Sequence, residues 1–505
     1  MKYCLVLSFL FISVISIAQS SKVFYNVREL GARSDGVTPD TKIINKAIED
    51  AAASGGGTIY FPAGNYLSGS IRLKSNICLF LEQGATLIAS SDSTDFDKPE
   101  ASVNDIYQDY GHSHWHNSFI WGEKIHDVSI IGSGKIWGKG LVRNGRNGDQ
   151  KPNKAIALLN CINVILKDFT IYHGGWFAIL ATGVDNFTID NLKVDTNRDG
   201  FDIDCCKNVR VSNCTVNSPS DDGICLKSSF GLGYARATEN VTITNCQVSG
   251  YEEGSLLDGT YKKGGYRIPD GGGPTGRIKF GTESNGGFKN IAISNCVFDF
   301  CRGLALETVD GALLEDVTIS NITMRDIINA PIFVRLGARM RGPDTIPIGQ
   351  CRRIIIQNVV AWNVDPKYGA IISGLPGHDI EDLQLSNIRF YYKGGGPKDS
   401  INRSVPEFEK NYPEPSRWGV MPSYGFFVRH VKNLKMHDVQ ISFMNDEPRP
   451  AFILDDVKGA ILYDVQAQVG NGTSTFVLKN STDIDLQKIK GVKDNYIKSA
   501  VKKNL

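Results

Sequence analysis

The chain has 505 residues, and 55 basic side chains nearly balance 54 acidic ones, leaving a formal net charge of +1. A general nucleic-acid binder carries a basic excess, so this balance argues against nucleic acid as a partner. Hydrophobic residues make up 41% of the chain, too many for a disordered protein and enough for a large core. Length alone suggests about three domains, but that estimate fails for chains built from repeats.

The N-terminus has the pattern of a secretory signal. Lys2 precedes a short apolar run over residues 5–17, and a small-x-small site ends at Ala18. Residues 1–18 are therefore predicted to be a signal peptide, and the protein is expected to be exported to the periplasm or secreted. No later segment reaches the roughly 18 apolar residues of a membrane helix, so no membrane span is expected.

One helix is predicted before the repeats begin. Asp40 stands at its N-cap position, and apolar residues recur on one face over residues 41–53. Three glycines at residues 55–57 then end the helix, and a strand begins at Thr58. Glycines that follow a helix and precede a strand reverse the order of a phosphate-binding loop. We expect this short helix to cap the open end of a coil.

A six-residue phrase recurs along the chain, with Asn or Asp followed by alternating aliphatic and polar residues and a polar pair. Several copies lie roughly 22–26 residues apart, the spacing of a solenoid. The copies begin at Asn163, Asn186, Asn208, Asn240, Asn290 and Asp316, and weaker ones begin at Arg353, Asn433 and Asp483. The alternation is typical of a strand with one buried face, and Asn and Gly supply left-handed turns.

These repeats predict an all-β protein, a single-stranded right-handed parallel β-helix with a short N-terminal capping helix. Residues 19–505 are expected to form one catalytic domain. Leucine-rich repeats are the alternative, but the leucine consensus that they need is absent. Four cysteines share an Asn-Cys context, at Cys161, Cys214, Cys246 and Cys296. They either stack as small buried groups or form at least one disulfide.

Two acidic segments give the sharpest chemical signal, NRDGFD at residues 197–202 and SDDG at residues 220–223. Asp199 and Asp221 are 22 positions apart, the offset between the phrases at Asn186 and Asn208. They are therefore expected on adjacent rungs, about 4.8 Å apart. Clustered carboxyls repel unless one keeps a proton, and a protonated and an ionised carboxyl together hydrolyse sugar bonds. Calcium binding and turn-forming aspartates are the alternatives.

The acidic segments also carry a family resemblance. NRDGFD and SDDG are similar to the NTDGID and DD signatures of the polygalacturonase family, glycoside hydrolase family 28, within the pectin-lyase-like β-helix superfamily. The resemblance extends from about Phe24 to the last repeats and implies that Asp221 is the general acid, while Asp199 and Asp222 activate water. It implies no metal ion or other cofactor. Asn197, Asp202 and Lys227 are expected to bind substrate or steady a carboxylate.

The chain departs from the family at two places. No histidine stands immediately before residues 279–287, where the family has GHG. The segment GRIK at residues 276–279 reads like the family's RIK but falls one coil too early, and the equivalent coil carries Ala305 and Glu307. In the family, the arginine and lysine of RIK hold the galacturonate carboxylate. Their absence at this position argues against galacturonan as the substrate. Arg277 and Lys279 either supply the charge from the neighbouring rung or are exposed strand residues.

Further binding candidates follow later in the chain. Arg335 and Arg339, with Arg341, follow one apolar strand and either bind a uronate or sulfate group or form a solvated rim. His430 is another candidate for substrate binding. The aromatic residues between Tyr412 and Tyr424 either stack on sugars or cover the side of the coil.

Three histidines, His112, His114 and His116, alternate, so on a strand they would face one side. That spacing suits a metal site or the edge of a substrate groove. The long segments at residues 97–118 and 251–275 predict a partly blocked groove, and hence exo action or short substrates.

The sequence therefore predicts an exported monomeric glycosidase that cleaves an acidic polysaccharide or its oligosaccharides, containing uronate or rhamnose, by inversion. The alternative is a β-helix lyase or dehydratase, in which Arg277 or Lys279 neutralises a uronate carboxylate during elimination. A non-catalytic glycan-binding protein is a third possibility, disfavoured because all three aspartates are present.

Overall fold

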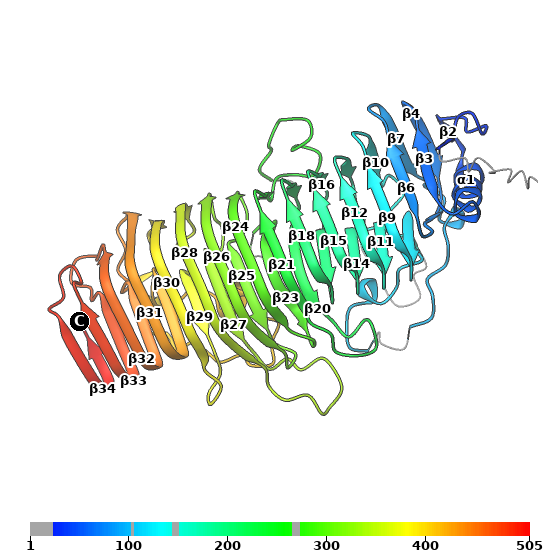
Figure 1. Cartoon of the computed structure of the whole chain (residues 1–505). Coiled ribbons are helices and arrows are strands. Elements are labelled where there is room, and N and C mark those ends of the chain that lie inside the picture. The colour runs from blue at the N-terminus through cyan, green and yellow to red at the C-terminus, as the bar shows by residue number, and fades with distance from the viewer. Residues whose placement is uncertain (1–23, 103–105, 144–150, 265–272) are drawn as a thin grey trace, which may run out of the picture.

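The computed structural model describes residues 24–102, 106–143, 151–264 and 273–505, so the predicted signal peptide lies outside the described residues. The chain winds into an elongated stack of parallel strands, with α1 (Thr41–Ala53) at one end and β34 (Asn495–Asn504) at the other (Figure 1). The predicted all-β parallel β-helix with an N-terminal capping helix is confirmed.

Each of the earlier coils gives one strand to each of three faces, named here sheets 1, 2 and 3. The strands of sheet 1 are β5 (Ile71–Arg72), β8 (Ile120–Glu123), β11 (Lys154–Leu159), β14 (Phe177–Thr182), β17 (Asp199–Asp204), β20 (Ile224–Ser228), β23 (Ile278–Ser284), β25 (Leu304–Thr308), β27 (Ile332–Leu336) and β29 (Ala370–Ser373). The strands of sheet 2 are β1 (Phe24–Asn26), β3 (Gly57–Phe61), β6 (Ile77–Leu81), β9 (His126–Ile131), β12 (Ile162–Lys167), β15 (Asp185–Asp190), β18 (Lys207–Ser212) and β21 (Thr238–Thr244). The strands of sheet 3 are β2 (Asp35–Pro39), β4 (Gly64–Ser68), β7 (Ala85–Ala89), β10 (Lys135–Trp137), β13 (Thr170–Tyr172), β16 (Lys193–Asp195), β19 (Thr215–Asn217) and β22 (Gln247–Ser249).

In the later coils, neighbouring faces share one long bent strand. These long strands are β24 (Phe288–Asp299), β26 (Leu313–Arg325), β28 (Gln350–Val364), β30 (Ile380–Gly394), β31 (Phe426–Asn445), β32 (Phe452–Ala467) and β33 (Phe476–Gln487). The remaining helical segments are short: α2 (Pro415–Trp418), η1 (Ser93–Asp95), η2 (Tyr110–His112) and η3 (Lys398–Asn402). The long strands keep the register of the coils beneath them.

The recurring phrase forms the strands of sheet 2 and the turns on either side of it. Its first and last residues adopt left-handed backbone, as at Asn208 (φ 57°) and Asn213 (φ 58°). Asn and Asp tolerate this conformation better than most residues. Their side chains also bond between coils: the Asn208 amide donates to Asn186 at 3.2 Å, and the Asn240 amide donates to Asn208 at 3.0 Å. The phrase therefore fixes both the turns and the register.

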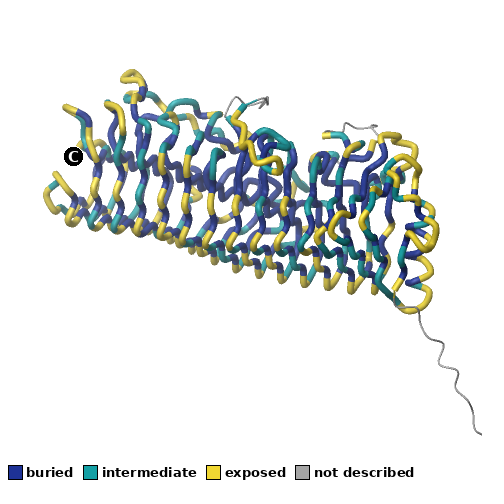
Figure 2. The backbone as a smooth tube through the Cα atoms, turned by 90° about the horizontal axis from the view of Figure 1, so that it is seen from above, coloured by how far each residue is buried: buried dark blue, intermediate teal, exposed yellow. Residues whose placement is uncertain are grey.

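The inward-facing residues of each coil form one continuous core, seen as dark segments between exposed turns in Figure 2. Phe452 stacks between Phe426 and Phe476, with ring centroids 5.4 Å and 4.9 Å away. The ten described cysteines are free thiols, and those of the Asn-Cys repeats are buried. The stacked-cysteine interpretation therefore holds in the described chain, rather than the disulfide alternative.

Both ends of the stack are covered. Helix α1 has the predicted bounds and packs against β3, β5 and β6. Asp40 precedes it, but its carboxylate accepts the N–H groups of Arg33 (2.7 Å) and Ser34 (3.0 Å) instead of capping the helix. At the other end, β34 pairs antiparallel with β33. An added strand there covers the edge of the last parallel coil.

Replacing Phe452 with Ala is expected to lower the free energy of unfolding by about 3–5 kcal/mol, because it removes the middle ring of a buried aromatic stack. Ile461→Ala is the matched control, since Ile461 lies on the same strand but is exposed. The control should stay within about 0.5 kcal/mol of the parent. Urea unfolding followed by circular dichroism measures both, and equal losses would contradict this description of the core.

Candidate active site

The three predicted catalytic aspartates lie together at one end of two adjacent strands of sheet 1. Asp199 begins β17, and Asp221 and Asp222 form the turn before β20. The Gly200 N–H donates to the Asp222 carbonyl at 3.0 Å, which places the acidic segments on adjacent rungs as predicted. Only glycine fits at Gly200, because an added Cβ would lie 2.2 Å from the Gly223 carbonyl oxygen.

The three aspartates differ in exposure and charge. The side chains of Asp199 and Asp222 are 4% and 3% exposed, whereas that of Asp221 is 27% exposed. Burial and the charges of Asp221 and Asp202 raise the pKa of Asp199 well above its usual range. Burial acts in the same direction on Asp222, but Lys279, Arg277 and Lys227 outweigh it and hold its pKa at about 2. The cluster therefore contains two neighbouring carboxyls whose pKa values are shifted in opposite directions.

Arg277 and Lys279 supply the charge that keeps Asp222 ionised. Arg277 Nε donates to Asp222 at 2.9 Å, and Lys279 Nζ lies 3.2 Å from the other carboxylate oxygen. Both side chains are only 2% exposed, so the alternative of exposed strand residues is wrong. The strand register places Lys279 beside Cys225 on one side and Ala305 on the other. This pairing agrees with the prediction that GRIK falls one coil before the family's RIK position.

Two further acids complete this buried network. Glu414 accepts a hydrogen bond from Arg277 at 2.7 Å and pairs with Arg302 at 2.9 Å. Glu307 lies 3.6 Å from Lys279 Nζ, and neither of its oxygens accepts a hydrogen bond from the described residues. Burial raises the pKa of Glu307 to about 7, although Lys279 and Arg277 oppose the shift. Glu307 thus replaces the family's lysine with a carboxyl that titrates near neutral pH.

Asp202 and Lys227 belong to a second buried network beside the first. Lys227 Nζ lies 3.3 Å from Asp202 and 3.1 Å from Glu283. His112 Nε2 lies 2.9 Å from the same Asp202 oxygen that faces Lys227. Lys227 therefore pairs with two carboxylates, whereas the resemblance implied that it would steady one. Because Asp202 is fully buried, it acts on Asp199 through its charge.

Arg198 is the functional candidate that the sequence reasoning missed. Its guanidinium lies 3.1 Å from Asp221 and 3.7 Å from Asp199. It also lies 4.6 Å from the centre of the Trp176 ring, which fixes its orientation. The signal was visible in the sequence, because an arginine stands between Asn197 and Asp199 where the family signature has threonine.

Three other predicted binding residues contact the protein itself, and their role toward substrate stays a prediction. Arg335 donates to Ser373 Oγ at 2.8 Å and to the Glu407 carbonyl at 2.8 Å. Arg339 donates to Asp310 at 3.0 Å. His430 lies 2.7 Å from Asp456 and 3.2 Å from Glu407. Burial alone would lower the pKa of His430, but these two acids raise it.

Asn197, the remaining predicted binding residue, lies half-buried in the turn before β17. Its backbone carbonyl accepts the Ser220 N–H at 2.9 Å, which ties the two acidic segments together. Its role toward substrate also stays a prediction.

Two loops cover sheet 1 on either side of the aspartates. The first consists of the described residues of the predicted segment 97–118, namely 97–102 and 106–118, whose Trp115 packs with Trp176 and Phe177. The second is residues 395–425, where Tyr412 Oη lies 3.2 Å from Lys279 Nζ and Trp418 packs on Phe333. Trp418 is buried, whereas Tyr412 is 44% exposed, so the aromatic loop both covers the coil and presents a ring.

The other predicted blocking segment, residues 251–275, also approaches the aspartates. Glu253 pairs with Arg143, whose carbonyl accepts a hydrogen bond from Arg198. The Thr275 N–H donates to the Pro219 carbonyl at 2.9 Å. Within residues 251–264, the Gly254 and Leu257 N–H groups each donate at 3.0 Å to Asp195 on sheet 3. The rest of that segment falls partly at residues 265–272, outside the described residues. The described parts of 97–118 and 251–275 therefore both lie near the aspartates, and 395–425 is a further cover that was not identified from the sequence.

The three alternating histidines do not share a face, because residues 110–112 form a 3₁₀ turn and not a strand. His114 Nδ1 lies 3.0 Å from the Tyr110 carbonyl, and His116 Nε2 lies 3.0 Å from Glu123. Ligand atoms of Asp109, His112 and Glu283 do lie within 4.8 Å of one another. However, the Arg341 guanidinium pairs with both Asp109 and Glu283 and supplies their counter-charge.

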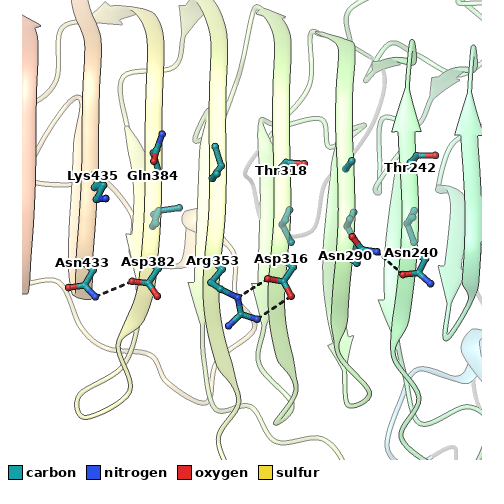
Figure 3. A pocket seen from close by; sticks show the side chains of 16 residues that line it. Asn240, Thr242, Asn290, Asp316, Thr318, Arg353, Asp382, Gln384, Asn433 and Lys435 are labelled. Carbon is teal, nitrogen blue, oxygen red and sulfur yellow. Dashed lines mark hydrogen bonds and ion pairs between the residues drawn. The ribbon is translucent and has the colours of Figure 1, made fainter.

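A hollow of about 730 Å³ lies on sheet 2, away from these residues (Figure 3). Its labelled polar side chains include asparagine and aspartate residues that hydrogen-bond from one coil to the next. Asn290 donates to Asn240 at 2.8 Å, and Asn433 donates to Asp382 at 3.0 Å. Asp382 begins a further copy of the phrase, DLQLSN, that the sequence reading had missed. We therefore assign this surface a structural role and place the candidate active site on sheet 1.

Comparisons with known proteins give two family models. Residues 24–134 match the family described as rhamnogalacturonase A/epimerase, pectate lyase-like. Residues 116–264 match the right handed beta helix region. Of the described helices, none has the length and apolar character needed to cross a membrane.

Individual relatives extend this likeness over most of the chain. A probable polygalacturonase of Vitis vinifera is 26% identical over 394 residues, covering 72% of this chain and 73% of the relative. An exo-poly-alpha-D-galacturonosidase of Dickeya chrysanthemi is 27% identical over 287 residues, covering 54% of this chain and 40% of the relative. The structure of a Thermotoga maritima exopolygalacturonase has a TM-score of 0.60 at 19% identity, covering 73% of this chain and 87% of that one.

The solved structure shows the shared fold, and the sequence relatives confirm the resemblance to the polygalacturonase family. They also support the prediction of a glycosidase of the polygalacturonase type.

We expect Glu307 to make stability depend on pH. Its pKa is about 7 in the folded protein, against an ordinary value of 4.5. Between these values the folded chain holds a proton that the unfolded chain has released, so stability falls as pH rises from 4.5 through 7. The loss should reach about 3 kcal/mol, and Glu307→Gln should remove it.

Urea unfolding of both proteins from pH 5 to pH 8 measures this difference. Glu381→Gln is the matched control, because Glu381 is an exposed glutamate on β30. A difference between parent and Glu307→Gln that stays constant with pH would contradict the assignment.

Proposed function

We propose that this protein is an exported, inverting glycosidase that hydrolyses α-linked uronate residues at the ends of acidic oligosaccharides, galacturonate above all. The observation that supports this most directly is the pairing of Asp222 with Arg277 and Lys279 beside a buried Asp199 whose pKa is raised, with Asp221 in the same turn as Asp222. Inverting hydrolysis needs one carboxyl to protonate the leaving oxygen and a carboxylate to activate water. The chain over residues 19–505 acts as one catalytic unit and as a monomer.

The roles follow from exposure and charge. Asp221 is the most exposed of the three acids and donates a proton to the glycosidic oxygen. Asp199 holds that proton in the free enzyme and passes it to its neighbour when substrate binds, which leaves Asp199 ionised. Asp222, held ionised by Arg277 and Lys279, then activates water together with Asp199.

The covering loops favour chain ends over long chains. Residues 97–118 lie over β14 on one side of the aspartates, and residues 395–425 lie over β23 and β27 on the other. A groove covered on both sides holds a short segment of glycan. We therefore propose exo action on uronate oligosaccharides, including fragments of rhamnogalacturonan.

Elimination is the second hypothesis, and the contacts of the basic residues weigh against it. It needs Arg277 or Lys279 to neutralise a substrate carboxylate. Arg277 is bound to Asp222 and Glu414, and Lys279 is bound to Asp222 and lies near Glu307. A substrate carboxylate would have to compete with these buried acids.

Trigalacturonate, rhamnogalacturonan fragments and alginate oligosaccharides form a suitable panel. New reducing ends without the absorbance of unsaturated uronate support hydrolysis. Appearance of that absorbance would establish elimination instead, and binding without turnover of any member would indicate a glycan-binding protein.

Asp199→Asn, Asp221→Asn and Asp222→Asn should each lower kcat/KM on trigalacturonate by at least about 100-fold. Asp221→Asn should retain most activity on an aryl galacturonide, because a good leaving group needs no proton. Asp127→Asn, at an exposed turn of sheet 2, is the matched control and should retain full activity. If Asp199→Asn alone is rescued by the aryl substrate, Asp199 is the general acid.

A further inference from the structure

The basic residues that the sequence nominated for substrate binding are already neutralised within the protein. Lys227 lies between Asp202 and Glu283, and Arg277 and Lys279 flank Asp222. Arg339 is bound to Asp310, and Arg335 is fully buried against backbone carbonyls. A charged substrate therefore needs another cation at the aspartates.

Arg198 has the position and the exposure for that role. Its side chain is 27% exposed, as is that of Asp221, its partner at 3.1 Å. Asp199 lies 3.7 Å from Arg198 Nε. The Trp176 ring and the Arg143 carbonyl, which accepts a hydrogen bond from Arg198 at 3.2 Å, hold the guanidinium in place. This cation is fixed in orientation yet open to solvent.

We propose that Arg198 is the carboxylate receptor of the active site: it binds the uronate carboxylate at the cleavage position in place of Asp221. A guanidinium offers paired N–H donors that match a carboxylate. The incoming carboxylate takes over the donors that Asp221 used, so Asp221 loses its counter-ion. This proposal rests on the proposed function, because it assumes a uronate substrate.

The exchange also explains how Asp221 becomes an acid. In the free protein Asp221 is paired with Arg198 at 3.1 Å. Once the uronate occupies Arg198, Asp221 faces the neighbouring acids without a cation. Arg198 Nε, 3.7 Å from Asp199, remains as the counter-charge of that acid, so the proton held by Asp199 moves to Asp221, and no proton is gained or lost overall. Binding of the charged substrate thus leads to protonation of Asp221, the catalytic acid.

Turnover of matched substrates tests the receptor. Arg198→Ala should lower kcat/KM on trigalacturonate by about 10- to 100-fold, the loss expected for charged hydrogen bonds. On the methyl ester of the same trisaccharide, the variant and the parent should agree within about threefold. The kcat/KM of Arg198→Lys on trigalacturonate should fall between those of the parent and Arg198→Ala. Arg210 is an exposed arginine on β18, and Arg210→Ala is the control. Equal losses on both substrates would overturn the proposal.

Binding measured by calorimetry tests the exchange without relying on turnover. Asp221→Asn removes the acid that competes for Arg198, so it should bind free galacturonate, which has no glycosidic bond to cleave, more tightly than the parent, by about tenfold. Adding Arg198→Ala should abolish that gain. If Asp221→Asn binds no more tightly, the exchange is wrong. If the parent cleaves nothing but shows this binding pattern, the hydrolase proposal fails while the receptor stands.

Discussion

Buried carboxylates on sheet 1 need counter-charges, and the candidate active site depends on how the chain supplies them. Charge buried without a partner is strongly unfavourable, so each acid must pair with a cation or keep its proton. Within the described residues, Asp222 pairs with two cations and Asp202 with Lys227, whereas Asp199 has only Arg198, 3.7 Å away. Because the three aspartates have different cationic partners, identical side chains differ in their acid–base behaviour.

The parallel coil makes such an arrangement possible. Residues at the same position of successive coils stack on one face, so a change of one coil places a residue beside another acid. Arg277 and Lys279 lie one coil nearer the aspartates than a family basic pair would, and they serve Asp222. Glu307 lies on the following coil, where the family signature would have its basic pair. Compared with the family signature that it resembles, the chain has the same aspartates but carries its basic residues on a different coil, and Arg198 is a partly exposed cation beside the described aspartates.

The alternating phrase and its asparagines were sufficient to predict the β-helix, since period-two burial and left-handed turns are local properties. The spacing of Asp199 and Asp221 likewise predicted adjacent rungs. The pairing of charges was not predictable, because Glu414 and Arg277 are 137 residues apart and meet only through a loop. The same holds for the covering role of residues 395–425 and for the separate partners of the three histidines, which depend on loop conformation.

The central claim is that Asp222 and Asp199 activate water on the face of the sugar opposite the leaving group, while Asp221 protonates the leaving oxygen. Proton NMR of freshly cleaved trigalacturonate tests this most directly. The account predicts that the β-anomer of the released galacturonate appears first and then equilibrates with the α-anomer. First appearance of the α-anomer, or of a vinylic signal from an unsaturated uronate, would contradict it.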